Sequence, residues 1–129
     1  MDGKKSFELK LKESFELYYN GGSIWAEHLD GMGNREDEII NKFKEDFKKM
    51  KRPSMTSFTI INLDETNITK TISETIIDAF KQCEKDFRKI ALIGVPKNKQ
   101  DLFFGIGPAS HAMIKFLDDY EKAKEWCLP

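Results

Sequence analysis

The amino-acid sequence predicts a single α/β domain, residues 1–129, built on a mixed β-sheet. Short apolar runs alternate with amphipathic helical segments along most of the chain, a pattern typical of parallel strands joined by right-handed crossover helices. An Asn-Gly-Gly turn at 20–22 lies between two alternating segments and predicts an antiparallel hairpin near the N-terminus. A length of 129 residues is typical of one domain with one shared core.

The N-terminal segments predict strands of the hairpin. Apolar and polar residues alternate over 6–11 and again over 15–19, which is the period of a strand with one buried face. Across the turn, 23–29 is the expected partner strand. The residues that share one face of this partner strand are Trp25, Glu27 and Leu29.

The first helix is predicted from about Arg35 to Lys51. Asn34 is suited to cap its N-terminus, and three acidic residues in the first turn complement the positive end of the helix. Apolar residues recur along one face of this segment at helical spacing, and Pro53 closes it. The basic residues near its end complement the negative helix terminus, so they do not by themselves indicate a nucleic-acid surface.

The central part of the chain predicts a buried strand followed by a second helix. The nearly continuous apolar run Phe58–Leu63 indicates a strand in the interior of the sheet. Thr71 and Glu74 have the three-residue separation of a capping box, so Thr71 is the expected N-cap. The helix is expected to start near Ser73 and to extend to about Lys85.

The C-terminal part predicts two further strands and two helices. Lys89–Val95 has the composition of a short apolar strand and ends at a proline, which cannot donate to a strand ladder. Asn98 is a candidate cap for a short helix, and Met113–Leu117 is the expected last strand. Asp118 or Asp119 is expected to cap the final helix.

An apolar loop is predicted between the last two strands. Phe103, Phe104 and Ile106 lie in this loop beside flexible glycines. The loop either folds into the core or remains exposed, as a contact patch for a partner or a cover for an apolar ligand. Inward packing is favoured.

The composition argues against several classes of function. Twenty-one Lys and Arg residues nearly balance 22 Asp and Glu residues, so no long-range field favours nucleic acid or an acidic membrane surface. No stretch approaches the roughly 18 apolar residues of a membrane span, and the N-terminus lacks the apolar core of a signal peptide. We therefore expect a soluble, cytoplasmic protein that does not bind nucleic acid.

The residue types needed for catalysis or metal binding are not grouped in the sequence. Cys83 and Cys127 stand apart from any CxxC or Cys/His cluster, and His28 and His111 lack a second ligand at helical spacing. No nucleophile and base are paired in a known catalytic pattern. We therefore expect no catalytic residues, no metal and no cofactor, and thus a protein that is not an enzyme.

The junction between the central strand and the second helix carries the candidate binding residues. The strand stops at Asp64, at a position where open α/β sheets place ligand-binding groups. A threonine-rich turn then leads to a helix N-terminus, where anions and phosphoryl groups are favoured. Ser73 and Thr71 are the candidate phosphoacceptors, although helix capping is the favoured role of these hydroxyls. The candidate partner- or anion-binding residues are Asp64, Thr69, Thr71, Ser73 and Glu74.

Three stretches of the chain carry a resemblance to a known family. They are IWAEHLDGMGN at 24–34, FTIINLDETNITKTISETIIDAF at 58–80 and IKFLDDYEKAKEW at 114–126. In their order and spacing they resemble the STAS domain, the sulfate transporter and anti-sigma factor antagonist family. The resemblance covers most of the chain and implies a mixed sheet with an N-terminal hairpin followed by βα repeats.

The family's central motif is an Asp-Ser-Ser-Gly tetrapeptide that opens the second helix, where a partner kinase can phosphorylate a serine. Alignment from Asp64 places the tetrapeptide 72–75 over this motif. Ser73 keeps a hydroxyl, Glu74 replaces the second serine, Thr75 replaces the glycine, and the leading aspartate is missing. The resemblance implies a regulatory domain that binds a protein partner at this junction. Glu74 could imitate a fixed negative charge at the helix start, although helix capping is the favoured role of this carboxylate.

The sequence favours a non-enzymatic regulatory or interaction domain that binds a protein partner around 64–74. The alternative is a carrier or sensor of a small apolar or anionic ligand, which would use the same junction with the 102–107 loop as a lid. Partner binding requires an exposed patch beside the second helix, whereas ligand carriage requires a closed pocket of about 300 Å³ or more. The oligomeric state has no signature in the sequence.

Overall fold

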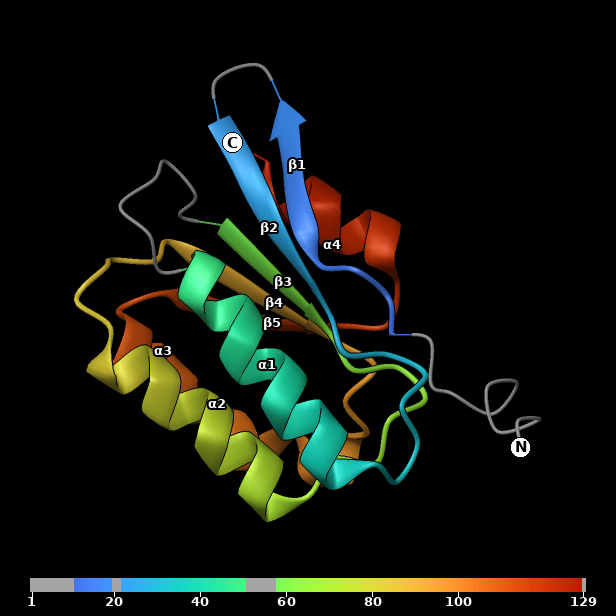
Figure 1. Cartoon of the computed structure of the whole chain (residues 1–129). Coiled ribbons are helices and arrows are strands. Elements are labelled where there is room, and N and C mark those ends of the chain that lie inside the picture. Colours follow the sequence, from blue (N-terminus) through green and yellow to red (C-terminus); the bar gives the residue numbers. More distant parts are fainter. Residues whose placement is uncertain (1–10, 20–21, 51–57, 129) are drawn as a thin grey trace.

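The computed structural model describes residues 11–19, 22–50 and 58–128. Its strands are β1 (Phe15–Tyr19), β2 (Gly22–His28), β3 (Phe58–Asn62), β4 (Lys89–Ile93) and β5 (Met113–Leu117). The strands lie side by side in the order in which they occur in the chain (Figure 1). β1 pairs with β2 in antiparallel orientation, and β2 to β5 are parallel to one another. The predicted fold class, a single α/β domain with a mixed sheet and an N-terminal hairpin, is confirmed.

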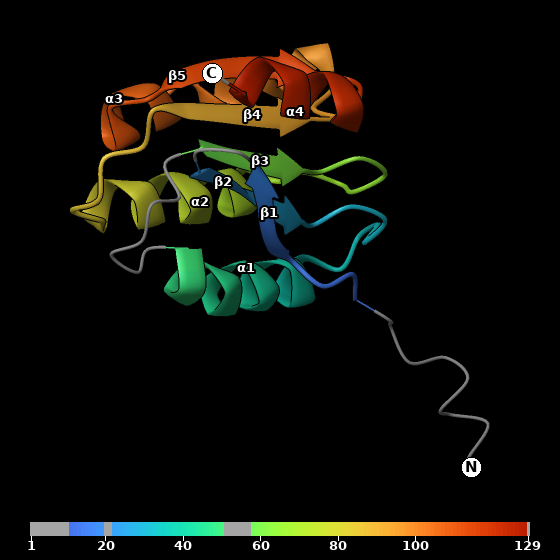
Figure 2. The same ribbon diagram turned by 90° about the horizontal axis from the view of Figure 1, so that it is seen from above.

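Helices cover both faces of the sheet (Figures 1 and 2). They are α1 (Glu36–Met50), α2 (Lys70–Gln82), α3 (Ile106–Ser110) and α4 (Tyr120–Cys127), with a 3₁₀ helix at Lys97–Phe103. Because every crossover between the parallel strands advances in the same direction, right-handed connections place α1, α2 and α3 on one face. α4 follows the last strand and packs on the opposite face, mainly against β3 and β4.

The sheet separates two apolar cores. The main core lies beneath α1, α2 and α3 and contains the chain of aromatic rings Phe43, Phe47, Phe80 and Phe87. The second core lies beneath α4 and includes Ala123 and Cys127. Successive residues of each strand alternate between these cores because side chains alternate across a strand. In β3, for example, Ile61 enters the main core and Ile60 the second core.

The predicted bounds agree with the structure where a strong local signal marks the end of an element. The last strand, Met113–Leu117, has the predicted bounds. Asp119 caps α4, and its carboxylate accepts a hydrogen bond from the backbone N–H of Glu121. Residues 6–10 of the predicted strand at 6–11, and the predicted helix end at Lys51 and Pro53, lie outside the described residues, whereas Leu11 is described and does not belong to a strand.

The predicted N-cap of the second helix was wrong. α2 begins at Lys70, earlier than the predicted start near Ser73, and it ends at Gln82 instead of Lys85. Thr69 is the N-cap: its backbone is extended, and its hydroxyl accepts a hydrogen bond from the N–H of Ile72 at 3.2 Å. The predicted cap, Thr71, therefore lies inside the first turn of the helix.

Two predictions about the end of β4 and the segment that follows it were also wrong. β4 ends at Ile93, before the predicted Val95, because Gly94 has a positive φ of 77° and turns the chain out of the sheet. Asn98 is not a cap: it lies within the 3₁₀ helix, which follows Pro96 and has no side-chain cap. A backbone bond from Lys99 N–H to the Pro96 carbonyl closes the first turn instead.

The apolar loop packs inward, as favoured by the sequence. Phe103 and Ile106 are fully buried in the main core. Phe104 points away from it and is 67% exposed. Phe103 and Ile106 therefore stabilise the domain as core residues and are not placed to act as a lid.

Candidate functional site

The candidate binding residues lie near the carboxyl-terminal ends of the parallel strands. The carboxyl ends of β2, β3 and β4 meet there, and the loops that follow these strands are in contact. Open α/β sheets bind ligands in a crevice at this edge where the strand order reverses. The parallel strands here follow one another in sequence order, so the sheet has no such reversal and forms no crevice of this kind.

The junction from β3 to α2 is anchored by hydrogen bonds to the loop that precedes α1. The buried hydroxyl of Thr66 donates to the Leu29 carbonyl at 2.6 Å and accepts from the Met32 N–H at 3.1 Å. Lys99 reinforces the other side, because its ammonium group donates to Asn67 Oδ1 and to the Ile68 carbonyl. These contacts hold the junction in one conformation.

The start of α2 already has an anionic partner within the chain. The Thr69 hydroxyl caps the helix and donates to the carboxylate of Glu36 at the start of α1. A carboxylate close to a helix N-terminus is favoured by the same electrostatics that would attract an external anion. The arrangement therefore does not favour a free anion site at this helix start.

Ser73 is poorly placed to receive a phosphoryl group. Its side chain is only 1% exposed, and its hydroxyl donates to the Lys70 carbonyl at 2.8 Å. A phosphate at this position would have to enter the packed interface beneath α2, where desolvating its charge is unfavourable. Because the hydroxyl points inward from the helix, the structure argues against Ser73 as a phosphoacceptor.

The other predicted residues divide by exposure. Asp64, Thr71 and Glu74 are exposed, whereas Thr69 is half-buried by its contact with Glu36. Glu74 Oε2 lies 3.9 Å from the Lys70 ammonium group, one turn away on the surface of α2. The junction therefore presents three of its five predicted residues to solvent, in two separate places: Asp64 in the turn and the other two on α2.

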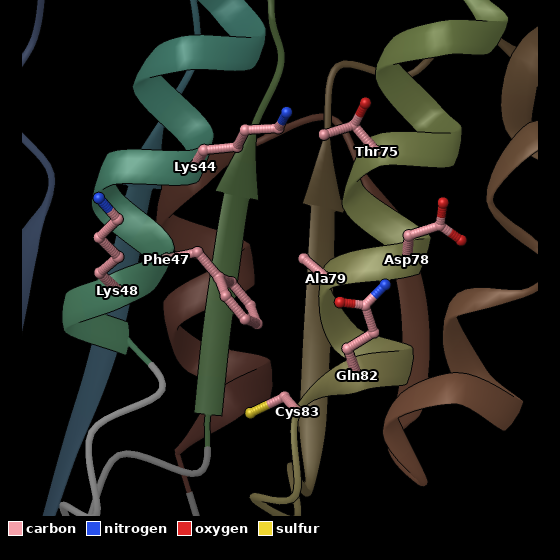
Figure 3. A pocket seen from close by; sticks show the side chains of 8 residues that line it. All are labelled: Lys44, Phe47, Lys48, Thr75, Asp78, Ala79, Gln82 and Cys83. Atoms are coloured by element: carbon pink, nitrogen blue, oxygen red, sulfur yellow. The ribbon is translucent and has the colours of Figure 1, made fainter.

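An open groove of about 490 Å³ lies next to this junction, between α1 and α2 (Figure 3). Phe47 of α1 and Cys83 at the end of α2 both point into the space between the helices (Figure 3). Polar side chains form its walls. The residues that line the groove are Lys44, Phe47 and Lys48 from α1, and Thr75, Asp78, Ala79, Gln82 and Cys83 from α2 and its C-cap.

Charges of both signs line this groove, and the Lys44 side chain extends toward α2, whereas the Asp78 carboxylate points away from α1 (Figure 3). Lys44 and Lys48 lie on the α1 wall, and Asp78 lies on the α2 wall. Thr75 directly follows Glu74, so the groove begins where the predicted binding junction ends. The groove has no signature in the sequence because its two walls come from segments that are brought together only by tertiary packing.

A second feature that was not predicted from the sequence is the buried carboxyl group of Glu27. This residue of β2 is 0% exposed and points toward α1. Its Oε1 accepts a hydrogen bond from the Trp25 indole N–H at 2.8 Å, whereas no donor among the described residues binds its Oε2. The signal was present in the sequence, since a glutamate shares the face of β2 with Trp25 and Leu29.

Burial raises the pKa of Glu27 to about 9, and the neighbouring Asp46 carboxyl adds to this effect. Asp46 is itself held by the Lys42 ammonium group at 2.7 Å and by the Ser14 hydroxyl at 2.9 Å. Although burial opposes it, the hydrogen bonds from Glu27, Lys42 and Ser14 lower the pKa of Asp46. Glu27 is therefore protonated at neutral pH and is able to donate to the Asp46 carboxylate.

A third polar cluster lies at the carboxyl end of β2. The ring of His28 lies 5.5 Å, centre to centre, from each of the rings of Phe15 and Tyr120. His28 Nδ1 is 3.3 Å from Asp30, which also forms an ion pair with Lys12. Aromatic packing and ion pairing account for this histidine, and the described residues contain no group of three or more His, Cys, Asp or Glu side chains placed to bind a metal.

Comparisons with protein-family models, with curated proteins and with solved structures found no match to this chain. In the part of the chain that the structure describes, no helix is both long enough and apolar enough to cross a lipid bilayer. The geometry around α2 is therefore the main evidence on function.

Proposed function

We propose that this chain is a non-enzymatic interaction domain that binds a protein partner through the exposed surface of α2. This surface, the α2 face, extends from the junction at 64–74 to the groove between α1 and α2. The groove is the observation that carries the proposal, because it provides an apolar floor and charged walls beside the second helix. Mixed surfaces of this kind are typical of protein recognition sites.

The groove defines the chemistry of the partner segment that fits it. An apolar side chain of the partner would pack against Phe47 and Ala79 on the floor. Acidic groups beside this anchor would face Lys44 and Lys48. An amphipathic helix or an extended segment with one apolar anchor and flanking acidic residues meets both requirements.

The resemblance to STAS domains supports the same surface and remains part of the proposal. The order of hairpin, helices and strands is the order on which that resemblance was based. The buried hydroxyl of Ser73 argues that binding does not depend on phosphorylation at the position of the family's phosphoserine. In this proposal Glu74 provides a fixed negative charge at the start of the α2 face.

A ligand carrier is less well supported by the geometry. Each of the cavities of about 300 Å³ or more described in this structure opens to solvent. Phe103 and Ile106, which the carrier hypothesis uses as a lid, are packed in the main core. The open groove therefore favours a macromolecular partner over a small enclosed ligand.

Charge reversal on the groove wall tests the proposal. The double variant Lys44→Glu, Lys48→Glu is expected to reduce partner retention at least tenfold, since it places like charges opposite the acidic groups of the partner. The measurement is quantitative mass spectrometry of proteins retained from extracts of the native cell by the wild type and by the variant.

The matched control is the double variant Lys97→Glu, Lys122→Glu, which makes the same charge change at exposed positions outside the groove. Proteins retained by the wild type and by this control, but lost with the groove variant, would support the α2 face as the binding surface. An identical set of retained proteins for all three would contradict it.

A further inference from the structure

In the part of the chain that the structure describes, β1 forms one edge of the sheet, and its only charged residue is Glu16. The backbone N–H and C=O groups on the outer side of an edge strand are available to a strand of a second chain. Natural proteins block such edges with lysine, proline or a bulge. β1, with the sequence FELYY, has no lysine or proline and pairs with β2 in a continuous register. β5, at the opposite edge, carries Lys115 at its centre.

Exposed apolar side chains gather around this edge. Six large hydrophobic side chains are exposed in the described residues, and three of them lie in β1 or in the groove beside it. These three are Phe15, Tyr18 and Leu128. Tyr18 is 80% exposed, which is unusual for an aromatic residue within a strand.

An apolar groove of about 320 Å³ continues this surface onto the face of the sheet that α4 covers. Leu17, Tyr19 and Ile24 contribute its apolar lining from the hairpin. Glu121 and Lys124 line its α4 side. Because α4 packs mainly on β3 and β4, the outer part of the hairpin has little cover on this face.

The sequence of β1 is complementary to itself in antiparallel orientation. A twofold axis at Leu17 would place Phe15 opposite Tyr19 of a second copy and Glu16 opposite its Tyr18. The first pair joins two aromatic rings on one face, and the second pairs a carboxylate with a tyrosine on the other face. No like charges lie opposite each other in this register.

β5, the strand at the opposite edge, is less suited to pair with a second copy of itself about a twofold axis at its central residue. A twofold axis at the central residue of β5 would place Lys115 opposite Lys115 of the second copy. Like charges directly opposite each other destabilise a strand pair. In the register centred on the middle residue, β1 is therefore more compatible with self-association than β5.

We propose that two copies of this chain associate through antiparallel pairing of their β1 strands, with Leu17 at the twofold axis. The two sheets join into one continuous sheet across this axis, and the aromatic side chains of both hairpins cover the seam. A strand of five residues buries less surface than the roughly 1,200 Å² of a stable complex, so we expect the association to be weak.

The proposal is independent of the α2 face, which lies apart from β1 with α1 between them (Figure 1). Sedimentation equilibrium of the full chain between about 1 and 500 μM measures the association. Three variants test its geometry. They are Tyr18→Glu, Tyr18→Lys and, on the opposite edge, Met113→Glu, and both sites are exposed enough for the fold to be retained.

The register predicts a different outcome for each variant. Tyr18→Glu places a carboxylate opposite Glu16 twice per dimer and is expected to weaken association at least tenfold. Tyr18→Lys places an ammonium group opposite the same carboxylate and is expected to stay within about threefold of the wild type. Met113→Glu is expected to have no effect.

Several outcomes would overturn the proposal. A wild type that remains monomeric over the whole concentration range would overturn it, as would a dimer that is unaffected by Tyr18→Glu. Equal weakening by Tyr18→Glu and Tyr18→Lys would contradict the register. Loss of association in Met113→Glu would show that the interface involves β5, which would also overturn the proposal. Because the α2 face is unchanged in these variants, partner retention separates a failure here from a failure of the proposed function.

Discussion

Replacing Glu27 with glutamine is expected to raise the free energy of unfolding by about 2–3 kcal/mol at pH 7 and to flatten its pH dependence. Glu27 is fully buried, and its pKa is raised from 4.5 to about 9 by burial and by Asp46. Glutamine keeps the shape, accepts from Trp25 through its carbonyl oxygen and donates to Asp46 without a proton that must be taken up.

The direction of the pH effect follows from the raised pKa. Between about pH 4.5 and pH 9 the folded chain holds the Glu27 proton, whereas the unfolded chain has released it. Stability therefore falls as pH rises through this window, by at most about 1.4 kcal/mol per unit, and the contribution of Glu27 is fully present only below about pH 4.5.

Urea denaturation of the wild type and of Glu27→Gln at pH 5, 7 and 9 measures this effect. The gap between the two proteins is expected to widen with pH. Glu38→Gln is the control, because Glu38 is an exposed residue of α1 that carries the same functional group. Parallel pH profiles for the wild type and Glu27→Gln would show that Glu27 is ionised in the folded protein.

Replacing Gly94 with alanine is expected to lower the free energy of unfolding by at least about 2 kcal/mol. Gly94 has a positive φ of 77°, which costs a residue with a Cβ about 1–2 kcal/mol. The added Cβ would also lie 2.6 Å from the Asp64 Cα, closer than two such atoms approach. Because the obstacle is backbone, the junction from β3 to α2 has to move.

The variant Gly31→Ala separates the effect of the positive φ from the effect of the close contact with Asp64. Gly31 also has a positive φ, of 70°, but no atom lies within 4 Å of its added Cβ. Its replacement is therefore expected to lower the free energy of unfolding only by the cost of a positive φ for a residue with a Cβ, about 1–2 kcal/mol. Urea denaturation of both variants measures the difference, and amide chemical shifts around Asp64 show whether the junction moves. Equal losses for Gly94→Ala and Gly31→Ala would contradict the close approach.

The strands and helices could be predicted because local patterns dominate their formation. The last strand was predicted with its observed bounds because alternating and apolar residues are followed directly by Asp118 and Asp119, one of which is a strong helix cap. The inward packing of Phe103 and Ile106 followed from their apolar character. At these positions the tertiary structure agrees with the local preference.

The N-cap of α2 could not be predicted from local sequence. Thr69 and Thr71 are both suitable caps by residue type. The choice depends on Glu36, which contacts the Thr69 hydroxyl from a position 33 residues earlier in the chain. A contact over this distance is set by the packing of α1 beside α2, which no short pattern encodes.

The candidate site was predicted in part. The exposed positions of Asp64, Thr71 and Glu74 agree with a binding surface, whereas the buried hydroxyl of Ser73 does not. Helical spacing alone places Ser73 next to the buried stripe of α2, but the depth of burial depends on the elements that pack against it. The groove depends in the same way on the distance between two helices.

Site-specific photocrosslinking in the native cell tests the α2 face most directly. A photoreactive residue in place of Asp78, on the groove wall, is expected to give discrete covalent adducts with a partner protein, and the same residue in place of Lys122 on α4 is expected to give none of them. Adducts that form equally from both positions, or only from α4, would contradict the account.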